Sequence, residues 1–301
     1  MGKILSKLNI WIMVMIILLS LVSCTEEIDR KFKTGKPQLV VDGFFTDQQQ
    51  DHFVKLSLSS SFLSNKPNPP LSGAQLSLSD GYSEIILNEL SDQVGTYRIP
   101  KSYRGIYGRT YTLKIAGIDI DSNGTDESYV ASNTLNPVVN IDSIALVWSS
   151  ARGQKQWQVL LYSREPEETT DYYAFGLFLN DKWITPKLSD LEYAEDKFYN
   201  GNDIVGAWVQ SVVEEDTDGE ATEHILKEGD WVKLEMQNIN KDYFDFILAV
   251  DAETGIKVPL FSGPPANVPT NISNGGRGFF RVYSLVQDSV KVSKEILEQR
   301  E

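Results

Sequence analysis

The chain has one cysteine and two histidines in 301 residues, and these scarcities exclude several kinds of site. A single thiol forms no disulfide within the chain, so a disulfide framework is excluded. Protein zinc sites use several cysteine and histidine ligands, and His52 and His224 are too few for one. A Ser-His-Asp triad would need one of these histidines, and neither lies near a nucleophile-elbow sequence. We therefore predict a protein without enzyme activity and without a cofactor.

Basic residues and long apolar runs are also scarce. The chain has 28 lysine and arginine residues against 42 acidic residues, which gives a net charge of −14 at pH 7. Nucleic acids bind basic surfaces, so we predict no nucleic-acid partner. The unbroken apolar run 10–19 is shorter than the about 20 residues that a membrane-spanning helix needs. A spanning anchor is therefore the weaker interpretation of this segment.

The apolar run follows Lys3 and Lys7 and leads into the sequence LVSC, whose last residue is Cys24. A basic start, an apolar core and small residues before a cleavage point make up a signal peptide. This layout resembles the signal peptide and lipobox of bacterial lipoproteins, which are cut before a cysteine that carries diacylglycerol. We predict that residues 1–23 are the signal peptide and that Cys24 is the lipid-attachment site. The alternative, Cys24 as an ordinary core residue, leaves its sequence context unexplained.

Residues 24–36 form a short polar segment, with three acidic residues within 25–29. This cluster resembles the export signal that sends lipoproteins of Bacteroidota to the cell surface. A solvated acidic tether is the alternative interpretation. Because several acyl chains on one cysteine anchor a protein stably in a bilayer, we predict an outer-membrane protein that is held by lipid and faces the cell exterior.

The rest of the chain consists of short alternating runs separated by turn residues, a pattern typical of β-sandwiches. Apolar and polar residues alternate over 54–59, 74–79 and 111–115, as in strands that bury one face. We predict a mainly β protein and assign residues 37–138 to a β-sandwich. This domain resembles the immunoglobulin-like and carboxypeptidase-regulatory-like sandwiches.

Residues 139–301 are predicted to form a larger, aromatic-rich β domain with one or two short helices. Residues 172–179 are nearly all apolar, as expected for a strand that is buried on both faces. Asn180-Asp181 then predicts a turn.

Helical spacing of apolar residues predicts a helix over 241–253. Asn240 is expected to cap its first turn and Gly255 to end it. A second short helix is predicted over 290–299.

The best metal candidate is the segment that holds Asp119, Asp121 and Asn123, followed by Gly124. Oxygen ligands at positions 1, 3 and 5 and glycine at position 6 match the start of an EF-hand calcium loop. The pattern fails at position 12, where Val130 stands in place of the bidentate acid. Asn123-Gly124 is also typical of a type I′ hairpin turn, which we favour over calcium binding.

Residues 214–220 hold five acidic side chains around Asp218-Gly219. Opposed carboxylates carry out acid–base chemistry in glycosidases. Charge runs are more often solvated, so we expect an exposed hairpin tip and not a catalytic site.

Five tryptophans follow the predicted cleavage point. Aromatic faces stack on sugar rings, so a glycan-binding platform is one interpretation. Because aromatic side chains bury large areas in β domains, we favour core positions. The five are Trp148, Trp157, Trp183, Trp208 and Trp231.

Several short motifs occur in order along nearly the whole chain. They are VVDGFFTD at 40–47, AQLSLSDG at 74–81, GIYGRTYTL at 105–113 and NISNG at 271–275. In this order they resemble the Bacteroidota lipoprotein family called domain of unknown function 4249. Members of that family resemble accessory lipoproteins that are often encoded beside TonB-dependent receptors. The resemblance implies a surface partner of an outer-membrane transporter, and it carries over no catalytic residue.

Three functions follow as hypotheses. The first is a non-catalytic capture or accessory module of a TonB-dependent transporter. The second is a scaffold or assembly factor of the outer membrane. The third is a carboxylate-dependent hydrolase, which would need two acidic side chains about 5–9.5 Å apart in a concave pocket.

Overall fold

The computed structural model describes residues 36–60, 66–198, 200–215, 221–254 and 268–300. The predicted signal peptide, Cys24 and nearly all of the predicted tether lie outside these residues, as does Gly255. Within the described ranges, no helix has both the length and the apolar character needed to cross a membrane.

The protein is mainly β, as predicted, and its described strands form two sheets. One sheet has twelve strands in the order β11-β10-β14-β15-β1-β2-β5-β4-β3-β6-β7, with β12 also paired to β10. The other has three strands in the order β13-β9-β8. The first strands are β1 (Leu39–Thr46), β2 (His52–Leu58), β3 (Gln75–Ser79), β4 (Glu84–Leu90), β5 (Gln93–Ile99), β6 (Thr110–Ile118) and β7 (Glu127–Thr134). The others are β8 (Ile141–Ser149), β9 (Lys155–Arg164), β10 (Tyr172–Leu179), β11 (Lys182–Trp183), β12 (Glu192–Glu195), β13 (Asp203–Glu215), β14 (Trp231–Ile239) and β15 (Arg277–Lys291).

The helices of the described residues are few and short. They are α2 (Lys241–Thr254), α3 (Lys294–Leu297) and the 3-10 helices η1 (Ala151–Gly153), η2 (Leu188–Asp190), η3 (Asp196–Phe198) and η4 (Glu298–Arg300).

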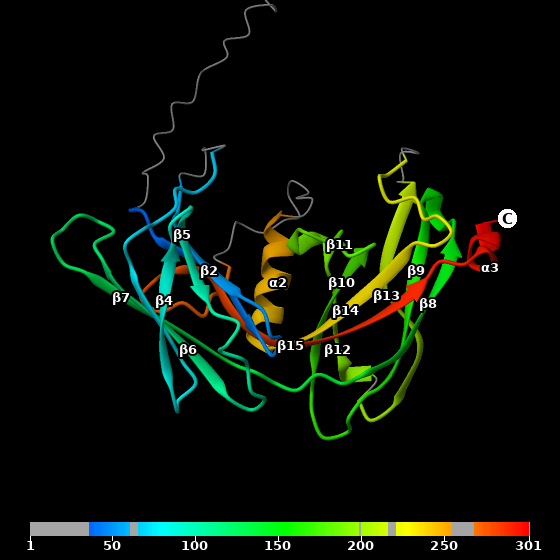
Figure 1. Ribbon diagram of the computed structural model, residues 1–301, viewed down its shortest axis with the longest axis horizontal. Coiled ribbons are helices and arrows are strands. Elements are labelled where there is room, and N and C mark those ends of the chain that lie inside the picture. Colours follow the sequence, from blue (N-terminus) through cyan, green and yellow to red (C-terminus); the bar gives the residue numbers. More distant parts are fainter. Residues whose placement is uncertain (1–35, 61–65, 199, 216–220, 255–267, 301) are drawn as a thin grey trace, which may run out of the picture. The chain divides into compact units, whose positions relative to one another are not determined.

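The last strand, β15, pairs with the first strand, β1, and so brings distant parts of the described chain together. It pairs antiparallel with β14 and parallel with β1, so it lies between them in the large sheet (Figure 1). Close approach of β1 and β15 depends on Gly278, because a Cβ there would lie 2.0 Å from the carbonyl oxygen of Val41. Gly278 also has a φ of +81°, which side chains with a Cβ rarely adopt.

Three apolar clusters make up the core. The first joins side chains of β1–β7 with Ile272, Phe280 and Val282. The second lies between the three-stranded sheet and one face of β10 and β14, so these two layers form a sandwich. The third lies between the other face of β10, strand β15 and helix α2. Because β15 contributes to the first and third clusters, it connects segments on both sides of the predicted boundary at 138/139, which itself stays a prediction.

Alternation along β10 explains how one strand serves two clusters. Tyr173, Phe175 and Leu177 enter the second cluster, whereas Ala174 enters the third. The prediction of a strand buried on both faces is therefore confirmed. Asn180 and Asp181 follow with φ values of 50° and 63°, the double positive φ of the predicted turn.

The predicted helix over 241–253 is confirmed as α2, and its Tyr243 and Ile247 are buried against the sheet. The expected role of Asn240 is only partly right. Its carbonyl oxygen accepts the first helical bond from Phe244, but its side-chain nitrogen donates to the carbonyl oxygens of Thr134 and Val282. Asn240 therefore ties α2 to the sheet.

The predicted helix over 290–299 begins too early. Val290 is still paired with Val232 in the ladder between β14 and β15, and α3 starts at Lys294 after Ser293 caps it. The β-branched residues around Val290 favour the strand, because the neighbouring β14 offers a complete row of partners.

Candidate functional site

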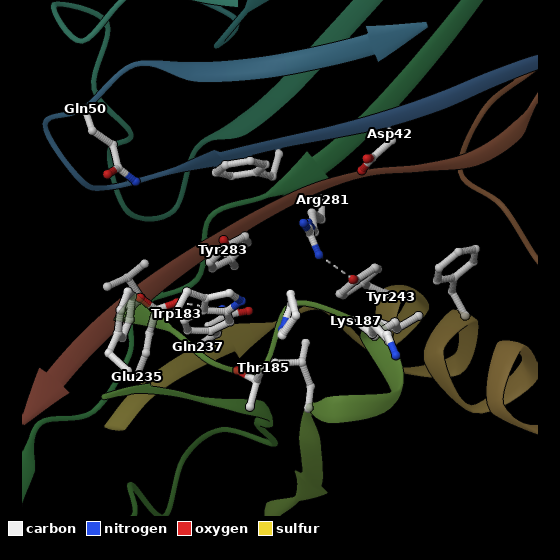
Figure 2. A pocket seen from close by; sticks show the side chains of 17 residues that line it. Asp42, Gln50, Trp183, Thr185, Lys187, Glu235, Gln237, Tyr243, Arg281 and Tyr283 are labelled. Atoms are coloured by element: carbon white, nitrogen blue, oxygen red, sulfur yellow. Dashed lines mark hydrogen bonds between the residues drawn. The ribbon is translucent and has the colours of Figure 1, made fainter. Parts of the chain in front are cut away.

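A cavity of about 470 Å³ opens on the face of the large sheet where β14, β15 and β1 lie side by side. Alternate residues of these three strands form the floor of the cavity. Glu235 and Gln237 of β14, Arg281 and Tyr283 of β15, and Asp42 of β1 line the cavity (Figure 2). Phe44 of β1 lines it as well. Helix α2 and the segment from Trp183 to Leu191 complete the walls.

Arg281 stands among three aromatic rings of this cavity. Its guanidinium carbon lies 5.3 Å from the ring centre of Phe44, 5.5 Å from that of Tyr243 and 5.9 Å from that of Tyr283. One guanidinium nitrogen donates to the hydroxyl of Tyr243 at 2.7 Å (Figure 2). These contacts hold a permanent positive charge on the cavity floor.

No carboxylate of the described residues contacts Arg281 directly, although the charge of Asp42 on the same floor acts on it from a longer distance. Among the residues that the structure describes, Arg281 forms no ion pair, and its buried Nε has no hydrogen-bond partner. Buried donors are normally paired, because an unmade hydrogen bond costs about 1–3 kcal/mol. Arg281 is therefore suited to bind an acceptor or an anionic group that enters the cavity.

Glu235 supplies the opposite polarity. Its two carboxylate oxygens accept hydrogen bonds from the side-chain amides of Gln237 at 2.7 Å and Gln287 at 2.8 Å. The two amides fix the carboxylate on the neighbouring strand of the floor. The cavity thus presents the cation of Arg281 and the oriented anion of Glu235 between aromatic walls, with Asp42 and Lys187 also among its lining residues.

The indole of Trp183 forms an aromatic wall of the cavity, because it packs on β10 at a glycine, Gly176. A Cβ at Gly176 would lie 2.0 Å from Cη2 of Trp183, so only glycine leaves room for the indole in this position. The indole also packs on Phe178 with ring centres 4.7 Å apart. The turn at Asn180-Asp181 carries the chain from β10 to β11 and so brings Trp183 over Gly176.

This combination of groups is suited to binding a small amphipathic molecule. Ligand cavities of about 300–1,000 Å³ typically combine apolar walls with a few oriented polar groups. Aromatic faces can stack on a planar or ring-shaped ligand, while Arg281 and Glu235 orient its polar ends.

The predicted calcium residues lie elsewhere, in the connection between β6 and β7. The structure brings Asp119 and Asp121 together with Glu127, which the EF-hand spacing did not indicate. Asp119 accepts the backbone N–H groups of Asn123 and Gly124, and the side-chain oxygen of Asn123 accepts from Thr125.

Lys36 supplies a positive charge to this loop. Its ammonium group lies 2.8 Å from Asp121, and this hydrogen bond lowers the pKa of Asp121 below its ordinary value. Asn123 does not have the positive φ that a type I′ turn requires, whereas Ser122 and Gly124 do have positive φ. The favoured two-residue turn is therefore wrong, and calcium binding at this loop stays a prediction.

The tryptophans are not all in the core. Trp157 is fully buried, as predicted, and Trp148 packs on it with ring centres 5.0 Å apart. Trp208 and Trp231 are exposed, so the prediction is wrong for these two. Trp208 lies on β13, which has a partly exposed face, and Trp231 is the first residue of β14, most of which is buried.

The expected exposed tip at 214–220 is also corrected at Glu214; residues 216–220 lie outside the described ranges. Glu214 is buried and accepts hydrogen bonds from the indole nitrogen of Trp157 at 3.0 Å and the backbone of Leu226 at 2.7 Å. It also forms an ion pair with Arg300. These contacts compensate its charge, so this acid joins the C-terminus to the second core cluster.

Sequence reasoning missed the cavity residues Arg281, Glu235 and Gln237. For Arg281 a signal was present, because it is a polar residue inside an otherwise apolar strand pattern, whereas Glu235 and Gln237 occupy ordinary polar positions of an alternating strand. What the pattern did not show is that β1, β14 and β15 are neighbours. Their convergence depends on pairings between distant segments.

Comparison with known families matches residues 25–289 to the family described as "Domain of unknown function (DUF4249)". The matched range contains every residue that lines the cavity. No protein with a curated description matches the chain.

Proposed function

We propose, from the premise that the chain belongs to the family described as domain of unknown function (DUF4249), that the protein captures a small ligand at the bacterial cell surface. In this proposal Cys24 carries the lipid that anchors it in the outer membrane. The protein then acts as an accessory module of a TonB-dependent transporter. The ligand would bind in the cavity around Arg281.

One observation carries the capture proposal: Arg281, on the floor of an aromatic cavity, forms no ion pair with the described residues and has a buried Nε without a hydrogen-bond partner. A ligand acceptor can supply the hydrogen bond that Nε of Arg281 lacks within the protein. The oriented carboxylate of Glu235 adds a second polar contact. A ligand with an anionic or strongly accepting group and a flat apolar face fits this arrangement.

The anchoring part of the proposal is supported by the sequence alone. Two lysines and an apolar run precede the LVSC sequence, which ends in Cys24, and acidic residues follow it. A surface anchor would place the cavity where it can meet external solutes before they enter a transporter.

Affinity purification tests the partnership. Tagged full-length protein is solubilised from outer membranes in mild detergent and purified. We expect a large membrane β-barrel to co-purify in near-stoichiometric amount. Recovery of the protein alone, under conditions that keep other transporter complexes intact, would count against a transporter partner.

A scaffold or assembly role is the second candidate, and one observation favours it. Val205 and Trp208 are exposed on β13, which is an edge strand of the three-stranded sheet. Exposed apolar side chains on a sheet edge are suited to protein contacts. Deletion of the gene separates the two roles, because capture predicts a growth defect on one nutrient and assembly predicts a general envelope defect.

A further inference from the structure

Three carboxylates converge at one end of β10. Glu165 follows β9, Asp171 precedes β10 and Asp196 follows β12. Asp171 and Asp196 are adjacent because Tyr172 and Glu195, the residues beside them, are partners in the ladder between β10 and β12. One oxygen of each of the three carboxylates lies within 4.8 Å of the corresponding oxygens of the other two.

The three side chains are buried. Their exposed fractions are 3% for Glu165, 8% for Asp171 and 3% for Asp196. Buried carboxylates are normally paired with a cation, because an isolated buried charge is very unfavourable. Within the described ranges, none of the three forms an ion pair with a lysine, an arginine or a histidine.

Only neutral groups of the protein donate to this cluster. The hydroxyl of Tyr173 donates to Glu165 at 2.9 Å, and the hydroxyl of Thr169 donates to Asp171 at 2.5 Å. The backbone N–H of Asp171 donates to Oδ2 of Asp196 at 2.9 Å. These bonds orient the carboxylates without neutralising them.

A second observation concerns oxygen atoms that have no donor. Oδ1 of Asp196 is buried and has no hydrogen-bond partner. The amide oxygen of Asn238 is also buried without a partner, and only 1% of this residue is exposed. The amide group of Asn238 is directed at the cluster, since its nitrogen donates to Oδ1 of Asp171 at 2.7 Å.

Asn200 adds a third unpartnered oxygen near Asp196. Its backbone N–H donates to the carbonyl oxygen of Asp196 at 2.9 Å, and its side-chain oxygen is buried without a partner. All of these unsatisfied atoms are acceptors, and the region has an excess of negative charge. A water molecule would donate to two of these acceptors but leave the negative charge uncompensated. A cation would bind the acceptor oxygens and also compensate the charge.

We infer that Glu165, Asp171 and Asp196, together with the amide oxygens of Asn238 and Asn200, form a binding site for one divalent cation, and that this cation is Ca²⁺. An all-oxygen ligand set excludes the nitrogen and sulfur ligands that zinc favours. Oxygens about 2.4 Å from a common ion lie at most about 4.8 Å apart, which is the limit that the three carboxylates meet. Mg²⁺ needs near-ideal octahedral geometry and retains water, so a dry and irregular set of acids and amides favours Ca²⁺.

The ion would fasten the end of β10 to the segments around it. Ligands come from the connection after β9, from the turn after β12 and from β14, all of which contact β10. Strand β10 also carries Gly176 and leads to Trp183 in the cavity wall. The inference concerns this structural site and is independent of what the cavity binds.

Calcium binding to the full chain, purified and treated with a chelator, tests the site. We expect titration with CaCl₂ to show one ion per chain, and thermal unfolding to shift upward by at least about 5 °C at saturating Ca²⁺. MgCl₂ at the same concentration should give a smaller shift. Absence of both stoichiometric binding and a calcium-dependent shift would overturn the inference.

Charge-removing variants separate an ion site from a merely structural cluster. Asp196→Asn and Glu165→Gln keep the shape and the accepting oxygens but remove one buried charge each. We expect each variant to bind Ca²⁺ at least tenfold more weakly than the unsubstituted protein. In chelator, each variant should unfold at a higher temperature than the unsubstituted protein. If a variant is equally destabilised with and without Ca²⁺, the cluster is structural only and the inference is wrong.

The loop between β6 and β7 provides the matched control. Asp119→Asn and Asp121→Asn remove charges from the other acidic group, which is more exposed and already has Lys36 as a partner. We expect these variants to retain the calcium response. Loss of the response in these variants, with retention in Asp196→Asn, would assign the ion to that loop and overturn the inference.

Discussion

Arg281 and Phe44 are register partners across the parallel pair of β15 and β1, and the guanidinium carbon lies 5.3 Å from the ring centre of Phe44. The two residues are far apart in the sequence, and this pairing places a cation on an aromatic face at the floor of the cavity. Desolvated cation–π contacts of this kind contribute about 2 kcal/mol. The contact holds Arg281 in place while leaving its Nε without a partner.

Replacement of Arg281 tests the cavity as a ligand site. We expect Arg281→Ala to reduce at least tenfold the amount of small molecule that co-purifies with the protein from whole cells, measured by native mass spectrometry, because a charged hydrogen bond contributes about 1.5–3 kcal/mol. Arg277→Ala is the control, since Arg277 lies on the same strand and donates to Gln38 outside the cavity. Equal losses in both variants would argue against a specific role for Arg281.

Gly176 is expected to tolerate no side chain while Trp183 is present. In Gly176→Ala the new methyl group would overlap the indole, and overpacking of this kind costs about 1–3 kcal/mol. Urea unfolding should show this loss in free energy of unfolding. In the Trp183→Ala background the same glycine substitution should have little effect, because the overlap is gone. Additive effects of the two substitutions would contradict the close contact.

His52 predicts a pH dependence of stability. It is fully buried against Phe44 and Phe45, and burial lowers its pKa from 6.5 to about 4. The unfolded chain therefore binds a proton between these pH values and the folded chain does not. Stability should be complete above pH 6.5 and should fall by up to about 3 kcal/mol as the pH drops to 4.

The pH effect is measured by urea unfolding at pH 7.5 and pH 4.5. We expect His52→Asn to lose most of the difference that His52 causes, although the carboxylates of the protein also titrate in this range. His224→Asn serves as the control and should retain the full difference. A wild-type profile in His52→Asn would show that another group is responsible.

Glu214 and Glu215 are adjacent but should differ strongly when substituted. Glu214→Ala leaves the indole nitrogen of Trp157 and the charge of Arg300 without their acceptor, and we expect a loss of about 3 kcal/mol in free energy of unfolding. Glu215→Ala removes a partly exposed ion pair with Lys155, and the loss should be under about 1 kcal/mol. Similar losses in chemical denaturation would contradict the buried role of Glu214.

Cys24 tests the proposed anchor. In Cys24→Ala the acyl acceptor is absent, so we expect the chain to keep its signal peptide or to leave the outer-membrane fraction. Immunoblots of membrane fractions, with Ser23→Ala as a control that leaves the thiol in place, measure this. Normal processing and anchoring of Cys24→Ala would contradict lipid attachment at this residue.

Local features of the sequence were sufficient for local structure. Period-2 alternation predicted the strands around Val54, Leu76 and Leu113, and helical spacing predicted α2 to within one residue at its C-terminal end. Asn180-Asp181 predicted its own turn because two successive positive φ values suit few residue pairs. In each case neighbouring residues carry the information, since a strand, a helix turn or a hairpin turn is decided within a few positions.

Glu214 and the exposed tryptophans show where this reasoning stopped. Alternation tells which side chains share a face, but it does not tell what covers that face. Glu214 is buried because Arg300 and Trp157 reach it from distant segments, and Trp208 is exposed because β13 lies at a sheet edge.

The sequence by itself determined a mainly β chain and the helix α2, because each depends on residues close together along the chain, and the LVSC sequence at Cys24 is likewise a local pattern whose lipid attachment stays a prediction. Only the tertiary structure decided which strands are neighbours. The parallel pairing of β1 with β15 creates the cavity floor from Phe44 and Arg281, and the pairing of β10 with β12 and β14 gathers Asp171, Asp196 and Asn238. Such pairings depend on the burial of whole sheet faces, which no single stretch of residues encodes.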